Sequence, residues 1–263
     1  MGPDEPFSNS SILLVAAHQD DEVIGAGAQL ASWRDRITIV HVTRGAPANP
    51  DDAHRAGCSS REAYAETRRR EVLNALRLAG VPSSNCLEIG VGDQEAAFEL
   101  SRIAAELRAI VERVRPAIVL THPYEGGHPD HDSTAFASHI ASQGTGAQVW
   151  EFTSYHAGPN GMETGRFLPH DGPQFRYTLS EKQKQGKQDM FGCFPTQAHV
   201  LKDFAVDFEN FRPAPKYDFS QPPHPGLLHY EQFDWGVKGP EWRELARAAG
   251  ERFQGLTHAT NHS

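Results

Sequence analysis

Cysteine is scarce in this chain of 263 residues, and the three that occur, Cys58, Cys86 and Cys193, form no CxxC pair. Their number and spacing exclude a disulfide framework and a zinc knuckle held by cysteines. Scattered thiols are typical of proteins that work in a reducing compartment. We therefore expect free thiols and a cytoplasmic location.

Long hydrophobic runs are also missing. No stretch reaches the ~18 consecutive apolar residues that indicate a membrane span. Residues 1–11 lack the basic start of a signal peptide, and the apolar run that follows them is too short for one. The sequence therefore predicts no membrane span and no secretion signal.

A basic excess is absent as well, because 25 lysines and arginines stand against 34 aspartates and glutamates, a formal net charge of -9. Nucleic-acid binding requires a basic face, so we expect no nucleic-acid partner. A small-molecule ligand is the expectation. The sequence leaves the oligomeric state open and is compatible with a homo-oligomer.

Short apolar runs alternate with amphipathic segments through the first 157 residues. This alternation predicts right-handed βαβ units and a mostly parallel sheet. The expected strands are 12–15, 37–43, 86–91, 117–121 and 148–155, and the expected helices are 23–33, 61–79, 100–114, 133–142, 180–190 and 241–253. The seventeen residues 44–60 are expected to form a loop.

The predicted fold class is α/β, a Rossmann-like three-layer sandwich with a C-terminal cap region. We expect a single domain over residues 1–263, in which residues 10–157 form the core and residues 158–263 a lobe that continues it. The lobe is rich in proline and aromatic residues. Packing is the main expectation for its aromatics, and a substrate-facing wall is the alternative.

One histidine and three acids follow the first predicted strand, in the sequence Ala17-His18-Gln19-Asp20-Asp21-Glu22. Four ionisable groups beside a buried strand are costly unless a partner compensates their charge. A divalent cation would do so, since His18 and Asp21 lie three residues apart on a turn that runs into a helix. Alone, such a pair is often only a surface turn or a helix cap.

A second polar cluster, His128-Pro129-Asp130-His131, follows the fourth predicted strand. Its two histidines repeat the three-residue spacing. In a mostly parallel sheet the loops after these strands open on one edge, so the two clusters could meet there. Histidine and carboxylate ligands with an open position are typical of a catalytic zinc site, with another divalent ion as the alternative.

Gly25 and Gly27 offer a competing interpretation, a dinucleotide site at the first turn. The phosphate-binding fingerprint needs its glycines in the turn itself. Here the turn holds Asp20, Asp21 and Glu22, which would repel phosphate. Close packing of the helix on a strand is the simpler expectation for both glycines.

These residues resemble the signatures of the LmbE-like (PIG-L) family of zinc-dependent N-deacetylases. Ala17 to Glu22 is similar to A-H-P-D-D-E, and His128 to His131 is similar to H-P-D-H. The segment from Arg68 to Val72 resembles R-x-x-E-L. The resemblance covers residues 10–155 well and is faint beyond them. It implies a zinc-activated water that attacks an N-acetyl amide.

By position, the resemblance assigns His18, Asp21 and His131 to the zinc and Asp20 to the general base. His128 would stabilise the oxyanion or act as a general acid.

The resemblance and the surrounding chain assign further roles. Asp130 is expected either to hold the His128 ring or to cap the turn. Arg68 corresponds to a substrate-binding arginine, and Arg44 and Tyr124 are further substrate-binding candidates. Two positions depart from the family: Gln19 replaces a proline, and Gly126 stands where members from a thiol-cofactor pathway carry a tyrosine.

Three functions fit these observations. The leading one is a metal-dependent hydrolase that removes an N-acetyl group from an amino sugar or its conjugate. A zinc amidase that acts on a non-sugar or larger-acyl amide is the second, and assays on sugar and non-sugar amides would separate the two. The third is a non-catalytic metal- or ligand-binding module, against which Asp20 and His128 argue because neither is needed to hold zinc.

Overall fold

A fully buried strand, β1 (Ile12–Ala16), lies at the centre of a seven-stranded sheet. The computed structural model describes residues 7–260, and the side chains of residues 7–253. The order of the strands is β3-β2-β1-β4-β5-β9-β8. Strands β1 to β5 are parallel, and β9 and β8 continue the sheet in antiparallel pairing beyond β5.

The remaining strands are β2 (Ile37–Pro47), β3 (Cys86–Asp93), β4 (Ile118–Thr121), β5 (Gln148–Phe152), β8 (Phe175–Thr178) and β9 (Phe208–Pro213), with a separate hairpin of β6 (Tyr155–Gly158) and β7 (Gly161–Thr164). The α-helices are α1 (Asp21–Trp33), α2 (Asp51–Arg55), α3 (Arg61–Leu78), α4 (Leu100–Val114), α5 (Pro129–Ser142), α6 (Glu181–Phe191), α7 (Ala198–Leu201) and α8 (Gly239–Thr260). Short 3-10 helices are η1 (Ser83–Asn85), η2 (Ala96–Glu99), η3 (Pro195–Gln197) and η4 (His229–Gln232).

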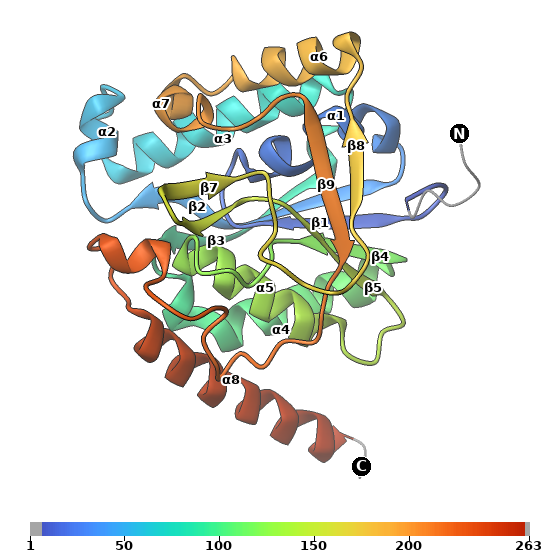
Figure 1. Cartoon of the computed structure of the whole chain (residues 1–263), viewed down its shortest axis with the longest axis vertical. Coiled ribbons are helices and arrows are strands. Elements are labelled where there is room, and N and C mark those ends of the chain that lie inside the picture. The colour runs from blue at the N-terminus through green and yellow to red at the C-terminus, as the bar shows by residue number, and fades with distance from the viewer. Residues whose placement is uncertain (1–6, 261–263) are drawn as a thin grey trace.

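Helices cover both faces of the sheet. Helices α1, α3 and α6 lie on one face, and α4, α5 and α8 lie on the other (Figure 1). Alternate residues of β1 divide between the two cores, because successive side chains of a strand point to opposite faces. Leu14 packs in the first core and Leu13 in the second.

The spacing of apolar residues explains how the helices attach. In α4, Leu100, Ile103, Leu107 and Val111 are buried, and the intervals of three and four residues place them on one face. The helix ends at Val114, because the φ of 49° at the next residue, Arg115, is left-handed and breaks the helical repeat.

The predicted fold class is confirmed: the protein is a three-layer α/β sandwich with a mostly parallel sheet. Three local expectations were wrong. Residues 44–60 are not one loop, because β2 runs to Pro47 and α2 follows. Helix α5 begins at Pro129 rather than at Ser133. The fifth strand ends at Phe152, and Tyr155 already belongs to β6.

The start of α5 has a clear physical cause. His128 is its N-cap residue, and its ring accepts a hydrogen bond from the backbone N–H of Asp130. Pro129 occupies the first helical position, where its lack of an N–H costs nothing. The second motif therefore forms the first turn of a helix rather than a loop.

Gly25 has the packing role expected for it. A Cβ at this position would lie 2.1 Å from Cδ2 of Phe152 on β5. The glycine therefore lets α1 approach the sheet closely, as predicted in place of a nucleotide site.

Within residues 7–260, no helix combines the length and the apolar character needed to cross a bilayer. Residues 1–6, which belong to the segment searched for a signal peptide, lie outside the described residues.

A buried ion pair joins α1 to β2. His41 Nε2 lies 2.9 Å from Glu22 Oε2, and neither side chain is exposed to solvent. Burial lowers the pKa of His41, but the neighbouring Glu22 carboxylate outweighs burial and raises this pKa to about 10. The histidine therefore stays protonated in the folded protein at neutral pH.

We expect this pair to make stability depend on pH. Because the folded-state pKa of His41 exceeds its unfolded value of about 6.5, its stabilisation is complete below pH ~6.5 and is lost as the pH rises towards 10. Replacing His41 with leucine should cost ~3–5 kcal/mol, because it leaves a buried carboxylate unpaired. Urea titrations at several pH values measure both effects, with the double variant His41→Leu/Glu22→Leu as the control. A single variant as stable as the parent would contradict the expectation.

Candidate metal centre

The two polar motifs meet at the carboxyl edge of the sheet. Strand β1 has β2 and β3 on one side and β4 and β5 on the other, so the chain reverses direction of winding beside it. Ligands of open α/β sheets bind at such a point. His18 follows β1 directly, and the motif of His128 to His131 opens α5 after β4.

Three side chains converge there. His18 Nδ1 lies 3.3 Å from His131 Nε2 and 3.3 Å from Asp21 Oδ2. His131 Nε2 lies 3.3 Å from Asp21 Oδ1. All three residues are buried, and together they form a group able to hold a metal ion. The structure therefore brings together the three residues predicted as ligands, although they come from segments more than a hundred residues apart.

The other ring nitrogen of each histidine contacts a residue outside this group of three. His18 Nε2 lies 3.2 Å from Asp130 Oδ2, and His131 Nδ1 lies 3.3 Å from Ser154 Oγ. These contacts leave His18 Nδ1 and His131 Nε2 free to face one ion. Carboxylate and hydroxyl partners of this kind fix the orientation of histidine ligands.

Negative charge accumulates around His18. Burial lowers the pKa of this imidazole, but Asp93, Asp130 and Asp21 outweigh burial and raise the pKa well above its usual value. Three carboxylates around one ring favour a positive charge at this position. A divalent cation between His18, Asp21 and His131 would supply it.

Asp20 pairs with Arg68. Its Oδ2 lies 3.3 Å from Arg68 Nη2, and Arg68 also donates a hydrogen bond to the carbonyl of Gln19. Burial raises the pKa of Asp20 to about 6 against the opposing effect of Arg68. A carboxylate with a raised pKa beside a metal centre is suited to accept a proton.

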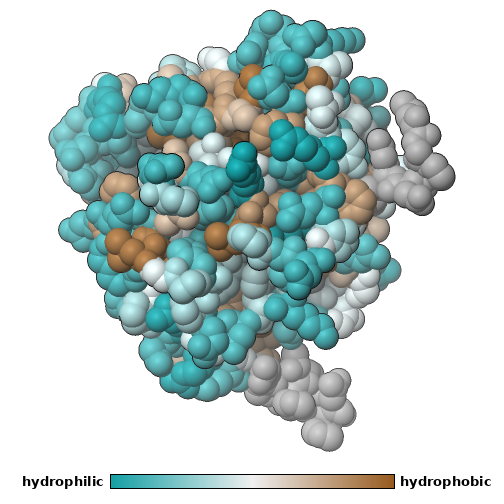
Figure 2. Space-filling view, viewed as in Figure 1, coloured by the Kyte–Doolittle hydropathy of each residue, from teal (hydrophilic) through white to brown (hydrophobic). Residues whose placement is uncertain are grey.

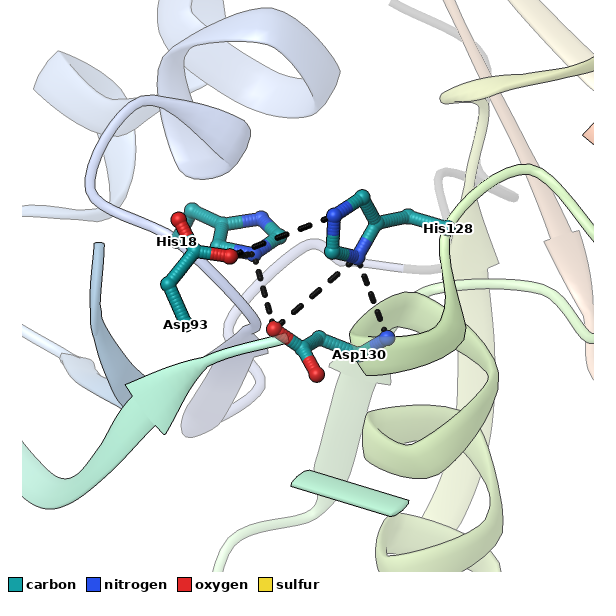
Figure 3. Close-up of side chains that lie close together, drawn as sticks. All are labelled: His18, Asp93, His128 and Asp130. Atoms are coloured by element: carbon teal, nitrogen blue, oxygen red, sulfur yellow. Dashed lines mark hydrogen bonds and ion pairs between the residues drawn. The ribbon is translucent and has the colours of Figure 1, made fainter. Parts of the chain in front are cut away.

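His128 is held as a neutral ring. Its Nδ1 accepts the hydrogen bond from the backbone N–H of Asp130, so a neutral ring carries its proton on Nε2. Burial lowers the pKa of His128 to about 3. Figure 3 shows Nε2 on the side of Asp93, with Asp130 next to Nδ1. The ring therefore offers an N–H donor without carrying a charge.

The carboxylate of Asp130 was expected either to hold the His128 ring or to cap the turn, but its hydrogen-bond partners lie elsewhere. It contacts His18 Nε2 and accepts hydrogen bonds from the backbone N–H groups of Gln94 and Ala96. Only the backbone of Asp130 orients His128, whereas its carboxylate lies 3.9 Å from His128 Nδ1. The N-terminal position of Asp130 in α5 explains this arrangement, because its N–H is one of the unpaired donors of the first turn.

Asp93, at the end of β3, belongs to the site and was not predicted. Its Oδ1 lies 3.3 Å from His18 Nε2 and 3.9 Å from His128 Nε2 (Figure 3). Burial raises the pKa of Asp93, but the two histidines and Arg68 outweigh burial and lower it. No motif surrounds Asp93 in the sequence. Its position after a strand at the same edge is the signal that could have identified it.

Two predicted substrate-binding residues lie away from the cavity. Arg44 is 45% exposed at its side chain and faces Glu88 at 3.7 Å. Tyr124 is buried beneath α8, where its ring stacks on Trp242 at 5.1 Å and its hydroxyl donates to the carbonyl of Gln221. Neither residue lines the cavity above the metal centre, whereas Arg68 does.

A cavity of about 420 Å³ opens above the metal centre. Its wall includes aromatic residues from the C-terminal region, because Phe204 and Trp235 line it together with Tyr155 of β6. Other aromatics of this region pack inside the protein, such as Phe211 and Tyr230. Packing is therefore confirmed for part of the aromatic residues of this region, and others line the cavity.

Gly127 lets the second motif pass close to β6. A Cβ there would lie 2.0 Å from the backbone oxygen of Tyr155. We expect Gly127→Ala to shift His128 and to destabilise the protein by ~1–3 kcal/mol. Gly186→Ala is the control, because a Cβ at that position in α6 meets no atom within 4 Å. Thermal unfolding and turnover of both variants test this, and equal behaviour would contradict the expectation.

Known proteins are similar to this chain over the part that holds both motifs. Residues 13–142 match the family described as PIG-L: GlcNAc-PI de-N-acetylase. A 1D-myo-inositol 2-acetamido-2-deoxy-alpha-D-glucopyranoside deacetylase of Catenulispora acidiphila is 34% identical over 153 residues, which are 49% of this chain and 47% of that protein. The enzyme of the same name from Thermobifida fusca is 33% identical over 149 residues, 48% of this chain and 51% of that protein. The chain thus spans about half the length of these curated relatives.

Solved structures share the fold. A deacetylase of the teicoplanin biosynthesis pathway aligns with a TM-score of 0.63 at 17% identity, over 79% of this chain and 98% of that one. The N,N'-diacetylchitobiose deacetylase of Pyrococcus horikoshii aligns with a TM-score of 0.54 at 19% identity, over 82% and 88% of the two chains. Residues 13–142, which hold both motifs and the convergent histidines, carry the similarity to the PIG-L (LmbE-like) family.

Proposed function

We propose that this protein is a zinc-dependent N-deacetylase that releases acetate from an N-acetylated amino sugar or its conjugate. The observation that carries the proposal is the convergence of His18, Asp21 and His131 beside Asp20 and His128. Relatives named as deacetylases of an acetamido sugar support the reaction type. Its three free cysteines support the proposal of a cytoplasmic location.

The donor atoms fit a zinc ion. Two ligands bonded to one tetrahedral zinc at about 2.0–2.1 Å lie roughly 3.4 Å apart. The contacts between His18 Nδ1, His131 Nε2 and Asp21 are each 3.3 Å. Three protein ligands leave a fourth position open, as in catalytic rather than structural sites. Zinc bound there would activate a water molecule at neutral pH and polarise the substrate carbonyl.

Asp20 is placed to take the proton of the attacking water. It adjoins the ligand Asp21 in sequence, yet its carboxylate faces the cavity and Arg68. The Arg68 guanidinium keeps the carboxylate fixed in orientation. The same group, once protonated, can pass the proton to the departing amine, so that atoms and charge balance across the reaction.

His128 is placed to stabilise the oxyanion. Its Nε2–H is the only donor that the neutral ring can offer, because Nδ1 already accepts from the backbone. A fixed N–H donor aimed at the developing charge typically contributes ~3–4 kcal/mol. We therefore propose oxyanion stabilisation by a neutral His128, in preference to a role as general acid.

Metal analysis and acetate release test the proposal together. The purified protein should bind about one zinc ion per chain and release acetate from N-acetylglucosamine conjugates. Apo-protein prepared with a chelator is expected to regain activity on addition of zinc. Acetate release from non-sugar amides alone would favour an amidase, and no hydrolysis of any amide by the zinc-loaded protein would contradict both activities.

A further inference from the structure

The cavity above the metal centre is rich in negative charge. Five carboxylates line it and only two guanidinium groups, and among the described lining residues there is no lysine. The carboxylates belong to Asp20, Asp21, Asp52, Asp93 and Asp203, and the guanidinium groups to Arg55 and Arg68. This balance is unusual for a site that would bind an anionic substrate, because phosphate recognition uses arginine or lysine.

Both arginines already have carboxylate partners. Arg68 is 3% exposed and lies 3.3 Å from Asp20 Oδ2. Arg55 Nη1 lies 2.6 Å from Asp52 Oδ1, and both residues line the cavity. A phosphate could use either guanidinium only by competing with the carboxylate that holds it.

A bound metal does not reverse the sign of the cavity. Five carboxylates against two guanidinium groups leave three net negative charges, and a divalent cation neutralises two of them. His18 and His131 would be neutral as ligands. The loaded cavity therefore remains slightly negative, and a substrate phosphate or carboxylate would meet like charge there.

Aromatic side chains also line this cavity. The Trp235 ring lies 4.6 Å from the His128 ring at an angle of 38°. Phe233 stacks on Trp235 at 4.5 Å and 15° and is 40% exposed, so the aromatic surface continues outside the cavity. The face seen in Figure 2 is mostly hydrophilic, with separate hydrophobic patches. Flat aromatic rings bind the apolar C–H face of a sugar ring without requiring charge.

We propose that the cavity selects uncharged N-acetylated glycosides, which pack on Trp235, and rejects substrates that carry phosphate. This inference rests on the proposed deacetylase function and adds the charge class of the substrate to it. The polar wall with Asp52 and Asp203 is suited to accept hydrogen bonds from sugar hydroxyls. The same carboxylates repel an anionic group on the substrate.

Matched probes test the charge preference. The zinc-loaded protein is assayed with methyl N-acetylglucosaminide and with N-acetylglucosamine 1-phosphate, and calorimetry measures the binding of both. We expect kcat/KM for the phosphate to be at least ~100-fold lower, a difference of about 2.7 kcal/mol. Equal kcat/KM values, or equal binding where turnover is absent, would overturn the selectivity but not the deacetylase. Acetate release from neither probe would count against the proposed function instead.

Reversing the charge of one exposed cavity residue tests whether the carboxylates cause the preference for uncharged substrates. Asp203 is exposed and lines the cavity, so Asp203→Lys should improve kcat/KM for the phosphate probe at least ~10-fold by adding a cation that has no carboxylate partner of its own. Asp189→Lys on the outer side of α6 is the matched control and should leave both probes unchanged. An identical gain in both variants would show an effect of overall charge and would overturn the assignment to the cavity.

The KM for the methyl glycoside tests the proposed packing of the sugar on Trp235. We expect Trp235→Ala to raise KM for the methyl glycoside at least ~10-fold with a smaller change in kcat, and Trp235→Phe to restore most of the affinity. A merely structural role through His128 would lower kcat instead and would leave KM unchanged. That second result, with no rescue by phenylalanine, would overturn the proposed sugar contact.

Discussion

Replacing His131 with alanine should remove the metal ion and almost all activity. His131 Nε2 lies 3.3 Å from both His18 Nδ1 and Asp21 Oδ1, so it would supply one of three ligands. Metal-ion catalysis contributes several kcal/mol, which corresponds to a loss on the order of 10³-fold or more. Zinc content by atomic spectroscopy and acetate release under saturating substrate measure the two effects.

His139→Ala is the matched control for this variant. His139 lies two turns further along α5 and bonds the carbonyl of Ala135, outside the metal centre. The His139→Ala protein should keep its zinc and most of its activity even if it unfolds at a lower temperature. A His131→Ala protein that retained one zinc ion per chain and normal turnover would remove His131 from the ligand set.

Asp20→Asn should separate chemistry from metal binding. The amide keeps the size of the side chain but cannot accept the proton, and general-base catalysis is typically worth ~10²–10⁴-fold in rate. Because Asp20 faces Arg68 rather than the three ligands, we expect the zinc content to remain that of the parent. Kinetics and metal analysis on the same preparation test this.

Loss of the charge partner of Arg68 will also affect stability. Thermal unfolding of Asp20→Asn distinguishes a weakened fold from a missing base, and Asp189→Asn on α6 is the control for the amide substitution. A folded, zinc-loaded Asp20→Asn protein that turns over at the parental rate would exclude Asp20 as the base.

The sequence predicted the site best where a motif of ionisable residues directly follows a buried strand. Two motifs, each directly after an apolar strand, predicted that His18 and His131 would come together, and the parallel sheet does bring them together. The physical reason is general: carboxyl ends of parallel strands share an edge, so residues that follow them become neighbours. The fold class could be predicted for the same reason, from the alternation of strands and helices.

The same rule could not decide the direction of individual side chains. Arg44 lies near the carboxyl end of β2 at the expected edge, yet its side chain turns outward to Glu88. Tyr124 lies only four residues before His128, yet α8 covers it. Whether a loop residue faces a cavity depends on the elements that pack over it, and these come from distant parts of the chain.

Trp235 could not be assigned from sequence at all. It lies in an irregular segment after η4, where no periodicity indicates which face is buried. Its contact with His128 joins positions 107 apart in the chain. Asp93 was easier in principle, since it lies two residues after the predicted strand 86–91, but a single aspartate without a surrounding motif carries little information.

The division of the cavity between two regions of the chain has an evolutionary consequence. His18, Asp20, Asp21 and His131 lie within the family match, whereas Phe204 and Trp235 lie beyond it. Under the proposed function, mutations in the later region can therefore change the substrate preference without disturbing hydrolysis, and a chimaera that exchanges this region between relatives should inherit the preference of its donor.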